Sequence, residues 1–199
     1  MIQPVVSLGA QQTALKPVWL TFDDGPHQTR TPALLDILAD RDLKATFFVV
    51  GARARQQSSL LDRMVGEGHR IGNHSYSHAR LTTLTRDAVR REIEMTDAVI
   101  APYVGPDKLF RPPYGATDAS IECEARDQGY RTVLWTLETE DWRQPPINWS
   151  QRSLDQLNGP APSVVLMHDT FRATLDQIQG FLAQLQSRAD TAVQSPFTL

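Results

Sequence analysis

Two aspartates, Asp23 and Asp24, stand side by side in the stretch LTFDDGPHQTRTP, residues 20–32. They follow an apolar run and precede a glycine-proline pair. Adjacent carboxylates repel each other, and when both are desolvated the pKa of at least one is expected to rise. A solvated turn is the simpler interpretation, because Asp, Gly and Pro are common turn residues. The alternative is a site in which a divalent cation relieves the repulsion by binding one of the two.

A second cluster, GNHSYSH at residues 72–78, contains His74 and His78. Histidines four residues apart on a helical turn share a face, with about 5–6 Å between their Cβ atoms. Two imidazoles and one carboxylate, with water completing the shell, form a known type of catalytic zinc site. The alternative is a pair of polar loop histidines. The aspartate pair could supply the third ligand that a metal site requires.

The third cluster, LFRPPYG at residues 109–115, contains Arg111 between an apolar run and two prolines. The prolines restrict the backbone and would hold the guanidinium group in place. Arg111 is either a surface arginine in a proline turn or a bidentate partner that orients a carboxylate and keeps it ionised.

Two further clusters follow apolar runs: WTLETEDW at residues 135–142 and VVLMHDT at residues 164–170. We expect Trp135 in the core and Glu140 in solvent. Trp142 could instead form a pocket wall or stack on a sugar. A single histidine after a strand is usually structural, but His168 and Asp169 belong to the fifth polar cluster of this kind.

The elements that must position these clusters alternate along the chain. Strands are predicted over 18–22, 46–50, 131–137 and 163–167. Helices are predicted from Thr31-Pro32 through ALLDILADR, and over 58–67, 86–100, 118–128 and 174–188. This alternation predicts βα units around a parallel sheet, whose ligands bind at the carboxyl ends of the strands. Five polar clusters would then converge on one edge, which makes five unrelated solvated turns a poor explanation.

Composition limits the class of protein. The 199 residues fit one domain, and 41% hydrophobic with 22% charged residues is an ordinary globular balance. The net charge of −3 disfavours nucleic acid or an anionic membrane as the main partner. The single cysteine, Cys123, excludes an internal disulfide. No apolar run reaches the roughly 18 residues of a membrane span, and the first residues lack the pattern of a secretion signal. We therefore expect a cytoplasmic protein, or a periplasmic or secreted one whose signal was removed.

The five clusters, in this order, resemble the motifs of the polysaccharide deacetylase family, carbohydrate esterase family 4 with its NodB-homology domain. The matching pieces are TFDDGP, HSYSH, RPPYG, EDW and LMHD. The spacer TPALLDILADRDLKATFFVVG and the segment RREIEMTDAVI resemble the family as well, so the likeness covers roughly residues 17 to 185. The resemblance implies an α/β fold, a distorted and incomplete (β/α)7 barrel. It predicts an N-terminal extension over 1–16 and one catalytic domain over 17–199.

The resemblance also implies removal of acetyl groups, usually from N-acetylated sugars, with a role for each matching residue. Asp24, His74 and His78 would bind the metal, expected to be zinc, with cobalt or another divalent metal as alternatives. Asp23 would be the general base, held by Arg111, and His168 the general acid. The backbone N–H of Tyr114 would stabilise the oxyanion. Trp142 and Leu166 would line the pocket for the acetyl methyl group.

Two departures from the family pattern affect these expectations. The fourth motif often begins with aspartate, but here it reads ETEDW, so that either Glu138 or Asp141 could tune His168. The C-terminal segment ADTAVQSPFTL lacks the usual glycine-aromatic approach to the last strand, which weakens the prediction of a closing strand.

The expected partner is an acetylated oligo- or polysaccharide such as chitin oligomers or peptidoglycan, and the sequence does not indicate an oligomeric state. One alternative is acetyl-ester hydrolysis on xylan, because attack by an activated water is common to both reactions. Another is a catalytically inactive carbohydrate-binding relative. Such a relative should have lost a metal ligand, the base or the acid, and all of these residue types are present.

Overall fold

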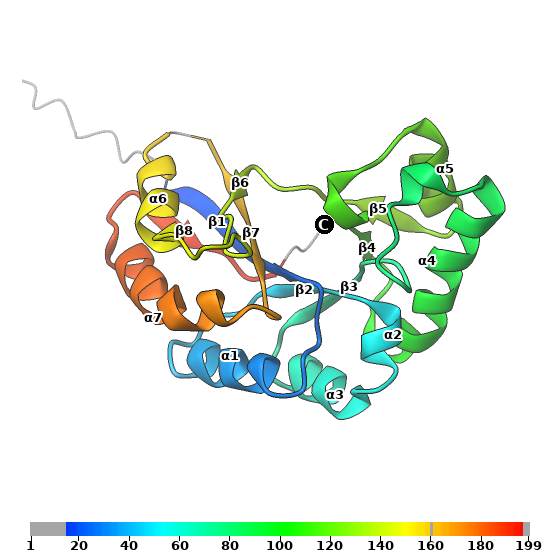
Figure 1. Cartoon of the computed structure of the whole chain (residues 1–199). Coiled ribbons are helices and arrows are strands. Elements are labelled where there is room, and N and C mark those ends of the chain that lie inside the picture. The colour runs from blue at the N-terminus through cyan, green and yellow to red at the C-terminus, as the bar shows by residue number, and fades with distance from the viewer. Residues whose placement is uncertain (1–14, 160, 197–199) are drawn as a thin grey trace, which may run out of the picture.

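A curled parallel sheet organises the protein, of which a computed structural model describes residues 15–159 and 161–196 (Figure 1). Its strands are β1 (Lys16–Asp23), β2 (Thr46–Val49), β3 (Arg70–Asn73), β4 (Lys108–Phe110), β5 (Tyr130–Thr132), β6 (Leu137–Glu138), β7 (Ser163–His168) and β8 (Thr191–Val193). The strand order is β5-β4-β3-β2-β1-β7-β6, and β8 pairs with β1 outside this path. Because β5 and β6 are not paired, the path of seven strands is an incomplete barrel, as expected.

The helices lie around the outside of this sheet, with α6 and α7 on the left of Figure 1, α1 and α3 below, and α4 and α5 on the right. Their bounds are α1 (Arg30–Ala39), α2 (Gly51–Ala54), α3 (Ser58–Gly66), α4 (Arg86–Ile100), α5 (Ala119–Asp127), α6 (Trp149–Gln156) and α7 (Arg172–Ser187). Three 3-10 turns are η1 (Leu81–Thr83), η2 (Ala101–Tyr103) and η3 (Pro113–Gly115). No helix in the described part of the chain is both long and apolar enough to cross a membrane.

Every strand pair in the sheet is parallel, so the carboxyl ends share one edge. The register places Asp23 of β1 beside His168 of β7. Further along the sheet, Asn73 of β3 pairs with Phe110 of β4. His74 and Arg111 are the residues that directly follow these two strand ends. The topology therefore brings all five polar clusters to the same edge of the sheet, because β6, which carries the fourth cluster, pairs with β7.

The predicted strand over 131–137 is wrong as a single element. Only 130–132 and 137–138 are strand, and the residues between them leave the sheet. The carbonyl oxygens of Val133 and Leu134 accept hydrogen bonds from the guanidinium group of Arg111, at 3.0 and 3.4 Å. These carbonyls therefore face a side chain instead of a neighbouring strand.

Other short elements carry too weak a local signal to be predicted. The strands β3, β4 and β8 have only three or four residues, and α6 follows a proline-rich loop. The doubtful closing strand does form, as β8 beside β1. Of the extension expected over 1–16, residues 1–14 lie outside the described residues, and β1 begins at Lys16.

The largest core cluster lies between the sheet and the surrounding helices. Its biggest side chain is Trp149 at the start of α6, which is fully buried. The Trp149 indole N–H donates a 2.9 Å hydrogen bond to the carbonyl of Ala173, and its ring centroid lies 5.4 Å from that of Phe181. Trp149 thus attaches α6 to α7, the helix that follows β7.

Trp149→Phe should lower the free energy of unfolding by about 1–3 kcal/mol, because it removes the indole N–H that donates to the Ala173 carbonyl and part of a buried ring. Chemical denaturation measures the change. Met95→Leu is the control, because Met95 is 45% exposed and its replacement should change the free energy by less than about 0.5 kcal/mol. An unchanged midpoint for Trp149→Phe would contradict this account of the α6–α7 contact.

Candidate active site

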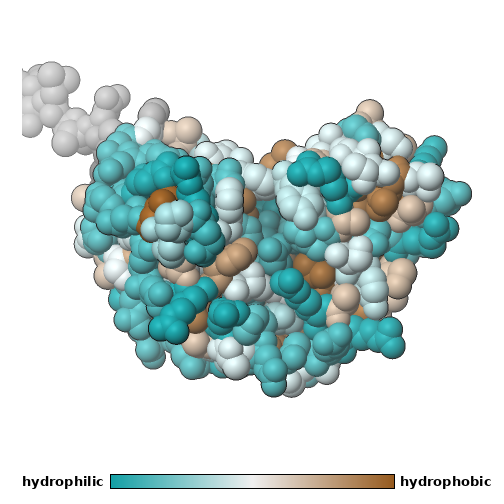
Figure 2. Space-filling model, viewed as in Figure 1, coloured by the Kyte–Doolittle hydropathy of each residue, from teal (hydrophilic) through white to brown (hydrophobic). Residues whose placement is uncertain are grey.

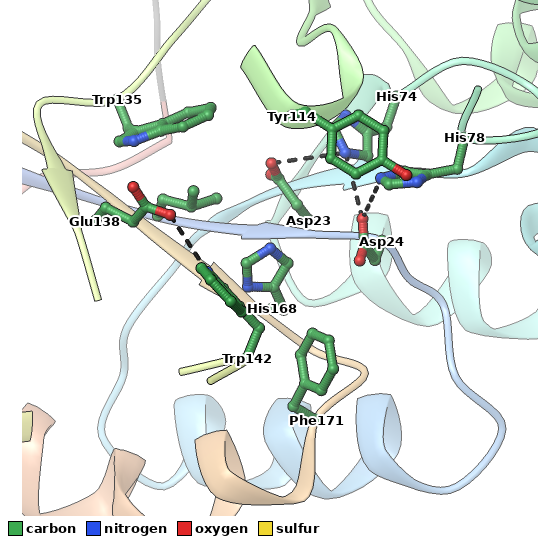
Figure 3. A pocket seen from close by; sticks show the side chains of 11 residues that line it. Asp23, Asp24, His74, His78, Tyr114, Trp135, Glu138, Trp142, His168 and Phe171 are labelled. Carbon is green, nitrogen blue, oxygen red and sulfur yellow. Dashed lines mark hydrogen bonds and ion pairs between the residues drawn. The ribbon is translucent and has the colours of Figure 1, made fainter. Parts of the chain in front are cut away.

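The polar clusters surround one cavity of about 420 Å³ at the carboxyl edge of the sheet. Figure 2 shows that this face is hollowed between the part of the molecule around α6 and α7 and the part around α4 and α5. Figure 3 shows the side chains that line the cavity pointing toward one another from several strand ends. They are Asp23, Asp24, His74, His78, Tyr114, Trp135, Glu138, Trp142, Leu166, His168 and Phe171.

Asp23 is paired with a completely buried arginine. Nη1 of Arg111 donates to Oδ1 of Asp23 at 2.7 Å and to Oγ1 of Thr21 at 2.8 Å. The Arg111 guanidinium also lies 4.1 Å above the ring of Phe48. Burial lowers the pKa of Arg111, and the charge and hydrogen bond of Asp23 oppose that effect. Arg111 is therefore a fixed, buried partner of Asp23 and not the surface arginine of the alternative interpretation.

Asp24 turns the other way, toward the two histidines (Figure 3). Its Oδ1 lies 2.9 Å from Nε2 of His78 and 3.4 Å from Nε2 of His74. Ligand atoms of these three residues all lie within 4.8 Å of one another. By contrast, the nearer Asp23 oxygen is 3.7 Å from His74 Nε2. The two neighbouring carboxylates thus have different partners.

Asp24, His74 and His78 together have the chemistry of a metal site. His74 Nδ1 donates a 2.7 Å hydrogen bond to the backbone carbonyl of Arg111, which leaves Nε2 free to bind a metal. Oδ1 of Asp24 is buried and has no well-aligned hydrogen-bond donor among the described residues. Burial alone would raise the pKa of Asp24, but its polar contacts with His74 and His78 outweigh burial and lower it.

The histidine segment is a loop and not the helical turn assumed for the spacing. His78 has a φ of 61°, in the left-handed region, yet the two ring centroids are only 5.1 Å apart. Glu92 of α4 holds the loop, because its carboxylate accepts hydrogen bonds from the backbone N–H groups of Tyr76 and Ser77 at 2.9 and 2.8 Å. No pattern within residues 72–78 indicates this support from α4.

His168 is held by Asp141, which settles which acidic residue of the fourth cluster contacts it. His168 Nδ1 lies 2.7 Å from Asp141 Oδ1, and the His168 backbone N–H donates to Oδ2 at 2.8 Å. Thr174 donates a further 2.6 Å bond to that oxygen, a contact the sequence did not suggest. Burial lowers the pKa of His168, but Asp141, with smaller contributions from Asp23 and Asp24, raises it to about 9.

Glu138 lines the cavity but does not hold His168. Its Oε1 accepts a 3.2 Å hydrogen bond from the indole N–H of Trp142, which orients that ring over the cavity (Figure 3). Leu166 lies in the same wall, beside Glu138 in the strand register. Glu140 forms ion pairs with Arg143 and Arg152 instead of being merely solvated.

Sequence reasoning missed some cavity residues. Trp135, expected in the core, lines the cavity, as does Phe171, whose ring packs edge-on against His168 at 5.4 Å between centroids. Phe171 lies three residues beyond His168, a proximity that could have indicated it. Tyr114 has a φ of 63° and a side chain packed between His78 and the guanidinium of Arg80, which is 4.6 Å from its ring centroid.

Asp169 does not face the cavity beside His168. It is buried beneath Gly25, where a Cβ atom would collide with its carboxylate, and it accepts a hydrogen bond from Thr31. Burial, with the nearby charge of Asp24, raises the pKa of Asp169 to about 7. Asp169 thus supports the turn after Asp24 from inside the protein.

Comparison with known proteins matches the polysaccharide deacetylase family model over residues 10–133. A peptidoglycan-N-acetylglucosamine deacetylase of Bacillus cereus is 33% identical over 90% of this chain and 66% of its own length. A peptidoglycan-N-acetylglucosamine deacetylase of Listeria monocytogenes is 35% identical over 87% of this chain and 36% of its own length. A chitooligosaccharide deacetylase of Rhizobium leguminosarum is 34% identical over 76% of this chain and 71% of its own length. The chain thus spans only part of these curated relatives.

Solved structures agree. T48 deacetylase, solved with substrate, superposes with a TM-score of 0.80 at 34% identity, covering 90% of this chain and 88% of that one. A pseudoenzyme of carbohydrate esterase family 4 from Bacillus anthracis superposes with the same TM-score, 0.80. It is 26% identical and covers 94% of this chain and 68% of its own. Similarity of fold therefore does not by itself show activity, which depends on the residues of the site. The fold, the matched sequence motifs and these relatives together show that the chain belongs to the polysaccharide deacetylase family.

Proposed function

We propose that this chain is a metal-dependent N-deacetylase that removes acetyl groups from amino sugars of peptidoglycan or chitooligosaccharides, with zinc as the metal. The relatives described above are deacetylases of these two substrates. The observation that carries the proposal is the joining of three groups in one cavity. They are the metal-ligand set with Asp24, the Asp23–Arg111 pair and the His168–Asp141 pair.

Amide hydrolysis needs an activated water, stabilisation of charge on the acyl oxygen, and a proton for the departing nitrogen. A divalent cation bound by Asp24, His74 and His78 would polarise the acyl oxygen and lower the pKa of a water molecule. The remaining requirements fall on side chains of the protein.

Asp23 serves as the general base. Arg111 and Thr21 fix one side of this residue, and its Oδ2 stays on the side of His74, 3.7 Å from Nε2. An oxygen in this position can take a proton from a water placed beside the metal ligands. A carboxylate that is itself a ligand would be less available for this role, so the separation of Asp23 from Asp24 supports it.

His168 serves as the general acid. Its Nδ1 is engaged by Asp141, so Nε2 is the nitrogen free to protonate the departing amine. With its pKa raised to about 9, the imidazolium form dominates at neutral pH and has a proton to give. Asp23 and His168 lie beside each other on β1 and β7, so the base and the acid reach the same scissile bond.

The cavity wall provides the remaining contacts. We assign the Tyr114 backbone N–H to the oxyanion; in support, Tyr114 lines the cavity, has a left-handed φ of 63° and packs its ring against that of His78. Trp142 and Leu166 form an apolar surface suited to the acetyl methyl group.

The other functions considered have less support. The relatives give no support to xylan as a substrate. A catalytically inactive relative should lack a ligand, the base or the acid, and each of these positions is filled by a suitable residue in the expected contacts.

An acetate-release assay with and without a chelator tests the proposal. Purified protein should release acetate from chitin oligomers or peptidoglycan glycan strands, lose this activity with a chelator, and recover it when zinc is added. Acetylated xylan is the comparison substrate. Release that is unaffected by complete metal removal would contradict metal dependence, and no release from any acetylated amino sugar would overturn the proposed function.

Asp23→Asn should keep bound metal but lose at least about 100-fold in kcat, because the amide cannot act as the base while Asp24, His74 and His78 are unchanged. His74→Ala is the paired variant and should lose both metal and turnover. Metal content and kcat are measured on the same samples. Full activity in metal-replete Asp23→Asn would refute the assignment of the base.

Asp141→Asn should bring the pKa of His168 down from about 9 toward its ordinary value of 6.5, because the amide removes the charge but can still accept a hydrogen bond. The acid must be protonated, so the fall of kcat on the alkaline side should move to lower pH. Histidine NMR titration of the metal-free protein measures the pKa directly.

The same pair affects stability, because a raised histidine pKa stabilises the folded state fully below about pH 6.5 and loses this contribution as pH rises through about 9. The stability difference between wild type and Asp141→Asn should therefore shrink over that range. An unchanged His168 pKa in the variant would show that Asp141 does not control the acid.

A further inference from the structure

A second groove, of about 450 Å³, adjoins the candidate active site. It is lined by Asp24, Pro26, His27, Gln28, Arg53, Thr170 and Phe171. Asp24 and Phe171 also line the first cavity, so the two spaces adjoin at these residues. A polymer whose acetamido group enters the first cavity would place a neighbouring sugar in the second groove, which has the size of an ordinary ligand site.

The charge of this groove differs from that of the first cavity. Arg53 of α2 lines it, and Arg53 Nη1 donates a 2.6 Å hydrogen bond to the backbone carbonyl of Asp24, which fixes the guanidinium at the boundary between the two spaces. Arg30 of α1 does not line the groove, but its Nη1 contacts Nε2 of His27, which does. Within the described residues, neither arginine has a carboxylate within 4.0 Å.

The acidic groups nearby do not neutralise these arginines. The Asp24 carboxylate is directed at His74 and His78, and Asp169 is buried beneath Gly25. The effect on His27 is consistent with a positive groove, because burial and then the charges of Arg30 and Arg53 lower the pKa of this histidine. The groove therefore has one lining cation, Arg53, which has no ion-pair partner among the described residues, and the carboxylate of the lining residue Asp24 is engaged with His74 and His78.

We propose that this groove binds a carboxylate attached to the sugar next to the one being deacetylated, so that the chain prefers carboxylate-bearing peptidoglycan strands to neutral chitin oligomers. The inference rests on the proposed function and deepens it. In peptidoglycan the carboxylate is either the lactyl group of N-acetylmuramic acid without a peptide, or a carboxylate of the peptide attached to that group. Arg53 presents the planar donor geometry that carboxylates accept, whereas a neutral sugar would leave its charge unpaired.

The test compares kcat/KM for acetate release from matched tetrasaccharides. One alternates N-acetylglucosamine with peptide-free N-acetylmuramic acid, and its partner carries lactyl carboxamides in place of the carboxylates. A second pair carries the stem peptide with free or amidated carboxylates, and chitotetraose is the neutral reference. Wild type should prefer the charged member of at least one pair by about five- to tenfold, mainly through KM, because the contact contributes to binding and not to chemistry.

Arg53→Gln should reduce this preference to less than about twofold, and Arg30→Gln should reduce it in part. Because Arg53 also supports the Asp24 carbonyl, the ratio between the two members of a pair is the readout, and a general loss of activity cancels from it. Arg55→Gln is the matched control, since it removes the same charge two residues further along, outside the groove lining. This variant should keep the wild-type ratio.

The possible outcomes separate the two proposals. A preference confined to the peptide-bearing pair, and lost in Arg53→Gln, supports the site with the peptide as the source of the carboxylate. Equal rates on charged and neutral members of both pairs, or an Arg53→Gln ratio equal to that of wild type, would overturn the inference while leaving the deacetylase proposal in place. Failure to release acetate from all five substrates would instead overturn the proposed function.

Discussion

The buried pair between Arg111 and Asp23 is the interaction on which the site depends. A fully desolvated guanidinium is tolerated only when its charge and its donors have partners. Here Asp23 supplies the charge, while Thr21 and the carbonyls of Val133 and Leu134 accept further hydrogen bonds. The same side chain therefore orients one carboxylate and fixes the irregular segment between β5 and β6. The backbone carbonyl of Arg111 in addition orients His74, a proposed metal ligand. The orientation of the proposed base and the architecture of the barrel therefore both depend on Arg111.

This arrangement explains how two adjacent carboxylates can have separate roles. Asp23 is the last residue of β1, whereas Asp24 has a φ of 74°, so the chain turns sharply between them. The turn directs one side chain to Arg111 and the other to the histidines. The buried side chain of Asp169 packs against this turn, in the space that a side chain on Gly25 would need. Repulsion between the carboxylates is thus relieved by giving each its own cationic or metal-binding surroundings.

The sequence predicted the parts of the fold and site that depend on local pattern. Long buried strands, amphipathic helices and polar residues at strand ends are visible in single segments, so the convergence of the five clusters could be predicted. The parts that were missed depend on distant residues. The loop of His74 and His78 needs Glu92 from α4, and the predicted strand over 131–137 is interrupted by hydrogen bonds from Arg111. The choice between Glu138 and Asp141 likewise required the position of β7 relative to β6.

The central claim is that Asp24 binds the metal and Asp23 does not. The most direct measurement is a crystal structure of the zinc-loaded protein with anomalous scattering at the zinc edge. The account predicts one zinc ion within about 2.0–2.2 Å of Asp24, His74 and His78, with Asp23 uncoordinated and still paired to Arg111. A zinc ion coordinated by both aspartates, or an Arg111–Asp23 pair that opens when zinc binds, would contradict it.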